Sequence, residues 1–164
     1  DLAMSPPCGP VHIELTGATA KKEVIEPQTQ KINEDYQINA DNLNTLKDAC
    51  ELINNASQPV FVIGLEARSI ENTEKIRQLI ERTGYPVLTT YKAKGVISDY
   101  HPQYAGIFTG GISESACISK ADLIILIGVD PVEFVLQKWR YQIPIIDISV
   151  VEYPVHYVKP DVGL

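Results

Sequence analysis

Two patterns of apolar residues alternate along this chain after residue 41. Short, largely apolar runs have the length and composition of strands that are buried on both faces, and they cover residues 60–63, 86–90, 123–127 and 145–148. Between these runs, apolar residues recur every three or four positions, as on one face of a helix. Buried strands separated by helices are typical of a parallel sheet with helices on both sides. We therefore predict an α/β, Rossmann-like fold of three layers.

The periodic segments between the strands predict the helices. They cover residues 41–55, 70–82 and 114–119, while residues 132–139 form either a helix or a tight loop. Asp41 is suited to cap the first helix, and Gly84 is expected to end the second. In that second helix, Ile76, Leu79 and Ile80 share one face, which we expect to be buried.

The first forty residues do not share this pattern. Residues 9–15 alternate apolar and polar side chains, which predicts a strand, and residues 21–40 are polar without a hydrophobic period, which is typical of a linker. A lone strand cannot bury itself, so we expect residues 1–20 to be the tail of a preceding domain. The Rossmann-like domain then covers residues 41–164. We expect it to be truncated at its C-terminal end, because residues 161–164 look like the start of a further strand.

Composition and charge argue against several classes of protein. Of the 164 residues, 45% are hydrophobic and 21% charged, as in ordinary globular proteins. The formal net charge of −7 and the lack of a basic stripe argue against nucleic-acid binding. No apolar run approaches the roughly 18 residues of a membrane span, and no secretion signal is evident, so we expect a cytoplasmic protein without a membrane partner. The three scattered cysteines are expected to be reduced thiols.

Glycines at the carboxyl ends of the predicted strands are the first candidate binding residues. Gly64 and Gly128 end two strands, and Gly110 and Gly111 precede a short helix. In an open parallel sheet, ligands bind beyond the carboxyl ends of the strands, where glycine lets the backbone approach a phosphate. The four glycines could therefore line a nucleotide pocket, or they could be turn residues only. No Gly-x-Gly-x-x-Gly run follows any strand.

Charged residues near the same strand ends allow two interpretations each. Asp147 could accept a hydrogen bond from a ribose hydroxyl, as acidic residues at strand ends do in dinucleotide folds, or it could cap the next segment. Lys92 and Lys94 could bind a phosphate or a partner carboxylate, or they could lie in solvent. Asp130 is expected to cap the segment that begins at Pro131.

Nothing in the sequence predicts a catalytic or metal-binding group. His12, His101 and His156 are far apart, and no acid–base partner is evident by spacing. No two metal ligands recur at the spacing that one helix or strand would need. A nucleophile elbow and a P-loop are both absent. We therefore assign no catalytic and no metal-ligating residue.

Several motifs, in order, resemble one enzyme family. The chain is similar to the central domain of thiamine-diphosphate-dependent enzymes of the acetolactate synthase and 2-oxo-acid decarboxylase type. Residues 9–15 resemble the last strand of the family's N-terminal pyrimidine-binding domain. The motifs that match the central domain are residues 59–64, residues 86–90 with Lys94-Gly95, His101-Pro102 with Gly106, residues 121–128, residues 146–148 and residues 160–162.

The resemblance implies a parent enzyme with two further domains. Such an enzyme would hold thiamine diphosphate and Mg²⁺ between its pyrimidine- and diphosphate-binding domains and act on a 2-oxo acid as a homodimer or homotetramer. The family's activating glutamate and its Gly-Asp-Gly metal motif belong to those two domains. The resemblance therefore implies that this segment is silent as a catalyst on its own and serves as a structural and oligomerisation domain.

Some relatives bind FAD or ADP in the central domain, and here this chain departs from their pattern. A glycine-rich run follows their first strand, but this chain has Gly64-Leu65-Glu66-Ala67. Their Arg-Phe pair after the later strand is replaced by Val129-Asp130-Pro131. Glu66 and Asp130 would place negative charge near a pyrophosphate. We therefore expect no tightly bound flavin, and we keep an adenine-nucleotide-binding module of the same fold as the second hypothesis.

Overall fold

The computed structural model describes residues 3, 9–23, 42–133, 139–151 and 158–164. Contacts between residues divide the chain into a smaller unit, Asp1–Ile38, and a larger unit, Asn39–Leu164. None of the helices in the described ranges is both long and apolar enough to cross a membrane.

The smaller unit has little regular structure among its described residues. Its helix α1, Gly17–Ala20, begins where the Thr16 hydroxyl accepts a hydrogen bond from the Thr19 N–H at 3.3 Å. The strand predicted at residues 9–15 is wrong: this segment carries no strand, and Ile13 is 82% exposed. A strand needs a neighbour for its hydrogen bonds, and the described part of this unit offers none. Most of the predicted linker, and the predicted cap Asp41, lie outside the described residues.

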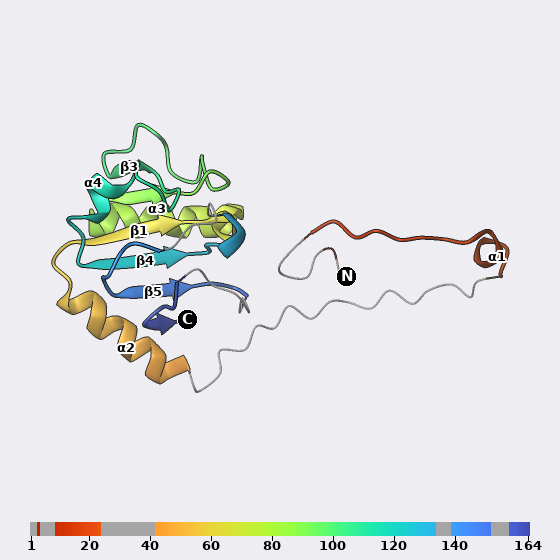
Figure 1. Ribbon diagram of the computed structural model, residues 1–164, viewed down its shortest axis with the longest axis horizontal. Helices are drawn as coiled ribbons and strands as arrows, with labels where there is room; N and C mark the ends of the chain where they lie inside the picture. Colours follow the sequence, from red (N-terminus) through yellow and green to blue (C-terminus); the bar gives the residue numbers. More distant parts are fainter. Residues whose placement is uncertain (1–2, 4–8, 24–41, 134–138, 152–157) are drawn as a thin grey trace. The chain divides into compact units, whose positions relative to one another are not determined.

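The larger unit is built on one parallel sheet of six strands in the order β3-β2-β1-β4-β5-β6. Figure 1 shows β1, β4 and β5 side by side with their arrowheads at the same edge. The strands are β1 (Pro59–Ile63), β2 (Val87–Thr89), β3 (Tyr104–Ile107), β4 (Leu123–Ile127), β5 (Ile145–Ile148) and β6 (Val162–Gly163). The α/β, Rossmann-like class that the apolar pattern predicted is thus confirmed.

The strand order creates a switch point between β1 and β4. The chain runs outward from β1 to β3, returns to place β4 against the other side of β1, and continues to β6. Connections on the two sides of this point diverge, and an open sheet of this kind binds ligands in the resulting crevice. Two short 3₁₀ helices begin there, η1 (Leu65–Arg68) after β1 and η2 (Pro131–Glu133) after β4.

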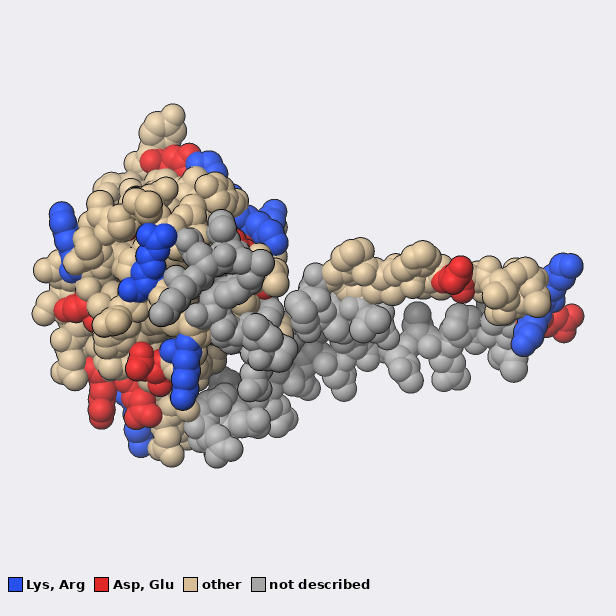
Figure 2. Space-filling model, viewed as in Figure 1, with Lys and Arg blue, Asp and Glu red and all other residues tan. Residues whose placement is uncertain are grey.

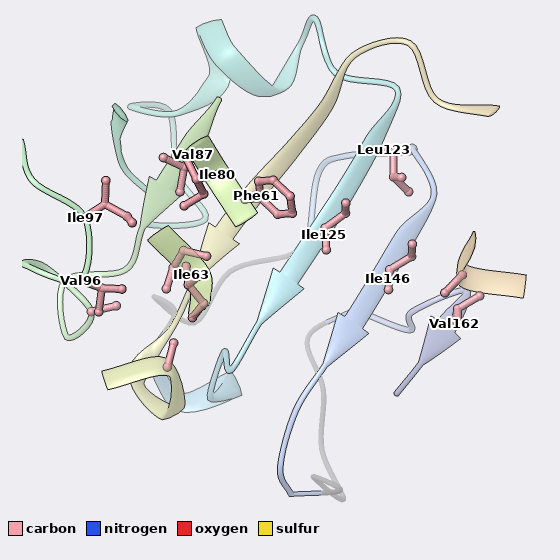
Figure 3. Packing of buried hydrophobic residues seen from close by; sticks show 14 residues of the cluster. Phe61, Ile63, Ile80, Val87, Val96, Ile97, Leu123, Ile125, Ile146 and Val162 are labelled. Carbon is pink, nitrogen blue, oxygen red and sulfur yellow. The ribbon is translucent and has the colours of Figure 1, made fainter. Parts of the chain in front are cut away.

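Each face of the sheet has its own apolar core. On one face, α2 (Asn42–Asn55) and α3 (Ile70–Thr83) cover a cluster that includes Phe61, Ile125 and Ile146; Figure 3 shows these side chains in a row along adjacent strands. On the other face, Val60, Leu88, Ile124 and Leu126 pack with Phe108 and with Ile118 of α4 (Ser115–Ile118). Burial on both faces explains why the central strands β1 and β4 are apolar throughout.

Helix α3 shows how local sequence fixes one of these covering elements. The Ser69 hydroxyl caps it by accepting from the Asn72 N–H at 3.1 Å. Gly84 ends it in the left-handed conformation, at φ 67°, with its N–H donating to the Ile80 carbonyl at 2.9 Å. Ile76 and Ile80 are buried as predicted, whereas Leu79 is 39% exposed, because it lies at the margin of the apolar face.

The sequence failed to predict β3. The segment Tyr104–Ile107 contains Gly106 at φ 117°, and the register with β2 shifts between Val87 and Leu88. An edge strand that is only half buried and interrupted by a glycine lacks the apolar run that identified its neighbours. Of the segment predicted as helix or loop at residues 132–139, the structure describes η2 and Trp139, and residues 134–138 lie outside the described ranges.

Candidate functional site

At the switch point, the loops after β1 and β4 touch through their backbones. The Gly64 N–H donates to the Ile127 carbonyl, and the Glu66 N–H donates to the Gly128 carbonyl, both at 2.9 Å. A Cβ at Gly64 would lie 2.3 Å from the Val129 Cα. Gly128 has φ 61°, and its Cβ would lie 2.8 Å from the backbone nitrogen of Ala67. Glycine is therefore required at both positions by the contact between the two loops.

Glu133 closes the same crevice with its carboxylate. Its Oε2 accepts hydrogen bonds from the Leu65 N–H at 2.8 Å and the Asp130 N–H at 3.2 Å. Its Oε1 accepts from the hydroxyl of the fully buried Thr90 at 2.7 Å. One side chain thus binds the loops that follow β1, β2 and β4.

Glu133 is not among the site residues predicted from the sequence, although the sequence contains a signal for it. Asp130 and Glu133 have the spacing of a capping box, in which the first residue caps the turn and the glutamate reaches back to its N–H. The structure shows both contacts, since the Asp130 carboxylate also accepts from the Val132 N–H at 2.9 Å. The predicted cap at Asp130 is thus confirmed, and it is one of the two contacts of this motif.

A second glutamate organises the loop after β3. Glu114 is 1% exposed, and its Oε2 accepts from the Thr109 N–H at 3.3 Å and the Thr109 hydroxyl at 3.1 Å. Its Oε1 accepts from the Tyr141 hydroxyl at 3.1 Å. Burial, followed by the negative charge of Glu114, raises the pKa of Tyr141 to about 12. The predicted pair Gly110-Gly111 lies in this loop, where the Gly111 N–H donates to the Thr109 hydroxyl at 3.0 Å.

A third glutamate, Glu66, reaches the loop after β5. Its Oε2 accepts from the Val150 N–H at 3.0 Å. We call Glu66, Glu114 and Glu133 the edge carboxylates. Together they accept a backbone N–H or a hydroxyl hydrogen from the loops after β1 to β5. Donors that face phosphate in nucleotide-binding folds face the chain's own carboxylates here.

A cavity of about 250 Å³ lies beside the switch point, at the carboxyl ends of β4 and β5. Its wall includes Gly128, Ile148 and Ser149 from the strand ends, and Asn72 and Lys75 from α3. The Lys75 ammonium lies 2.6 Å from the Glu71 carboxylate at an exposed position. The wall of the cavity thus combines apolar side chains with polar and charged ones.

The structure brings together only two of the five residues predicted to line a nucleotide pocket. Gly64 and Gly128 meet at the switch point, and Gly128 lines the cavity. Gly110 and Gly111 follow the edge strand β3, which β2 separates from β1. Asp147 is 5% exposed and in register with Leu126, whose side chain packs into the core on the other face from the cavity. The assignment of these five residues to a nucleotide stays a prediction.

The predicted cationic loop after β2 is held from two sides. Lys94 lies 2.7 Å from the Asp99 carboxylate, and this hydrogen bond raises the pKa of Lys94. The Arg77 guanidinium donates to the carbonyls of Gly95 and Val96 at 3.3 and 2.8 Å. On the face shown in Figure 2, Lys and Arg of the larger unit are interspersed with Asp and Glu. No group of three possible metal ligands occurs within the described ranges.

Comparison with known proteins gives a consistent result. Residues 46–163 match the family "Thiamine pyrophosphate enzyme, central domain". The chain is 36% identical over 85 residues to an acetolactate synthase from Mycobacterium bovis, an alignment that covers 51% of the chain and 14% of that protein. It is 23% identical to a 2-hydroxyacyl-CoA lyase from Arabidopsis thaliana over 176 aligned positions, which cover 100% of the chain and 30% of that protein.

Two further comparisons point the same way. Pyruvate decarboxylase isozyme 3 of Saccharomyces cerevisiae is 30% identical over 112 residues, or 66% of the chain and 20% of that protein. A solved structure of a candidate thiamin diphosphate-dependent enzyme from Mycobacterium smegmatis superposes with a TM-score of 0.68 at 23% identity, which shows a shared fold. The matched segment covers 90% of this chain and 29% of that one. The chain thus spans less than a third of the length of each of these relatives.

Proposed function

Because this chain belongs to the thiamine pyrophosphate enzyme family, as its central domain, we propose that it links and orients the two catalytic domains of a larger enzyme. The parent enzyme uses thiamine diphosphate with Mg²⁺ and acts on a 2-oxo acid, as a decarboxylase or as an acetolactate-synthase-like carboligase. It assembles as a homodimer or homotetramer in the cytoplasm, without nucleic acid or membrane as a partner. The named relatives support the reaction class, since they include an acetolactate synthase and a pyruvate decarboxylase.

The described residues do not fit thiamine diphosphate or its metal ion. The donors at the carboxyl edge of the sheet already bind the edge carboxylates. The described residues also contain no cluster of metal ligands. We therefore assign cofactor binding and catalysis to the parent enzyme's other domains, and no catalytic step to this chain.

One observation supports the structural role. At the carboxyl edge of the sheet, where such folds bind ligands, the chain's own carboxylates accept the hydrogen bonds of the loops. Glu133 alone binds the loops after three strands, with distances of 2.7 to 3.2 Å. A sheet whose loops are fixed by internal hydrogen bonds holds its shape without a ligand. That property suits a domain whose task is to keep two other domains in place.

A second candidate function is an adenine-nucleotide-binding module, with FAD or ADP as the ligand. The cavity beside the switch point favours it, because its 250 Å³ lie at the strand ends where such folds bind nucleotides. Two negative charges argue against it, because they would repel a pyrophosphate. Glu66 lines the cavity, and Asp130 is two residues after Gly128, which also lines it.

Thermal unfolding in the presence of nucleotides separates the two functions. A ligand that binds the folded state at 100 times its dissociation constant stabilises it by about 2.7 kcal/mol. We expect no change in melting temperature with ADP, FAD or NAD at millimolar concentration. Inorganic pyrophosphate, which lacks the adenosine group, is the control for effects of the anion alone. A shift of several degrees with ADP or FAD would replace the structural role by the nucleotide-binding one.

A further inference from the structure

We propose that Glu133 is a built-in occupant of the anion site at the switch point, and that its removal uncovers a binding site for pyrophosphate and nucleoside diphosphates. The inference concerns the specificity of this crevice and holds whichever reaction the parent enzyme catalyses. It assigns to one side chain the exclusion of a ligand class that the fold would otherwise accept.

The donors around Glu133 form a complete anion cradle. They are the N–H groups of Leu65 and Asp130, at 2.8 and 3.2 Å, and the hydroxyl of Thr90, at 2.7 Å. These three donors come from the loops after three adjacent strands, β1, β4 and β2. Their hydrogens converge on two oxygens that belong to one carboxylate, the arrangement that an external anion finds in a ring of backbone donors.

Two features make the internal carboxylate a strong competitor. Glu133 is three residues from Asp130 and is held there by the turn in which the Asp130 carboxylate accepts from the Val132 N–H at 2.9 Å. A tethered group has a high effective concentration at its site, so a free anion has to displace it at a disadvantage. A diphosphate that approached without displacing it would meet a like charge.

Among the described residues, the backbone where the loops after β1 and β4 meet is already packed and hydrogen-bonded. The Gly64 backbone is packed so closely that a Cβ there would lie 2.4 Å from the Gly128 carbonyl oxygen. The Glu66 N–H, a further donor in the loop after β1, is already bonded to the same carbonyl at 2.9 Å. At the contact between these two loops, the N–H groups of Gly64 and Glu66 are therefore not available to a phosphate, whereas the three donors bound by Glu133 become available when that side chain is removed.

The test is a titration of the whole chain with inorganic pyrophosphate, followed by calorimetry and by the amide signal of Leu65. Glu133→Ala is expected to bind pyrophosphate at least tenfold more tightly than the wild type does, and pyrophosphate is expected to shift the Leu65 amide signal of this variant. Glu81→Ala is the matched control, because it removes one negative charge from an exposed position in α3 and leaves the three donors with Glu133. Adding Thr90→Val to Glu133→Ala removes one donor and is expected to reduce the gain.

Each outcome decides the matter. Saturable binding to the wild type with a shift at Leu65, an equal gain in Glu81→Ala, or a folded Glu133→Ala with no gain would each overturn the proposal. Should Glu133→Ala not fold, Glu133→Gln, which keeps the length and loses the charge, is titrated with the same expectation. If neither folds in buffer, restoration of folding by pyrophosphate supports the proposal, and its failure rejects it.

Discussion

Only glycine fits at positions 64 and 128, because the two loops that carry them touch. The place of these residues in the sequence does not reveal this contact. Each follows an apolar strand, a pattern typical of phosphate-binding loops as well as of ordinary turns. In the structure, each glycine makes room for the backbone of the other loop. The requirement is steric and acts on the folded chain itself, so it is measurable as stability.

Gly64→Ala should lower the free energy of unfolding by about 3 kcal/mol, at the upper end for overpacked sites. The added methyl group would overlap the Val129 Cα and the Gly128 carbonyl, both of which are backbone atoms that cannot swing aside. Gly163→Ala is the control, because a Cβ there meets no atom within 4 Å, and it should change stability by less than about 0.5 kcal/mol. Urea unfolding measures both, and equal effects would contradict the packing described.

The raised pKa of Tyr141 gives a prediction in alkaline solution. With a folded-state pKa of about 12 against an ordinary value of 10.0, this phenol keeps its proton in the folded protein after it has lost it in the unfolded chain. Its contribution to stability is complete below pH 10 and falls away as the pH rises towards 12. Wild type should therefore lose stability over this range more steeply than Tyr141→Phe, as followed by unfolding at a series of pH values. Parallel curves would show that the hydroxyl is not protected by burial and Glu114.

At the scale of elements, helix α3 is stabilised by the burial of its apolar face and by a cap at each end. Ile80→Ala should cost about 3 kcal/mol, as deletion of a fully buried aliphatic side chain does. The adjacent Leu79→Ala should cost less than about 1 kcal/mol, since Leu79 is 39% exposed. Denaturant unfolding of the two variants compares them directly. A larger loss at Leu79 would mean that the helix is rotated from the position described.

The connection between α2 and β1 depends on a carboxylate from a distant part of the chain. Asp122, which precedes β4, accepts from the N–H groups of Ser57 and Gln58 at 2.7 and 2.8 Å, and these bonds lower its pKa. The stability that they provide is present above the ordinary value of 3.8 and is lost as the pH falls from there through the lowered pKa. Asp122→Asn should thus be less stable than wild type at pH 7 and match it near pH 2, by thermal unfolding. A difference that persists in acid would argue against the carboxylate as its source.

The elements that the sequence predicted are those with a strong local pattern. Residues 123–127 are apolar throughout and form β4 between the predicted bounds, since both faces of a central strand are buried. β3 at the edge has half-buried residues and a glycine, so its place is set by pairing with β2, which no local pattern encodes. The segment at residues 9–15 shows the opposite case, because it has the alternation of a strand without a neighbouring strand in the described part of its unit.

For the molecule as a whole, the fold followed from the sequence and the arrangement of the candidate site did not. The glycines at the strand ends were recognisable, but which of them meet depends on the strand order. The edge carboxylates were not predicted, because Glu114 and Glu66 reach Tyr141 and Val150, which are 27 and 84 residues away in sequence. Only Glu133 had a local signal, in its spacing from Asp130.

The proposed role is that this domain positions catalytic domains and performs no chemistry itself. Sequencing the coding region on both sides of this segment tests it most directly. We expect a pyrimidine-binding domain with an activating glutamate upstream and a Gly-Asp-Gly metal motif downstream. A reading frame that begins near Asp1 and ends near Leu164, with neither domain, would contradict the proposed role.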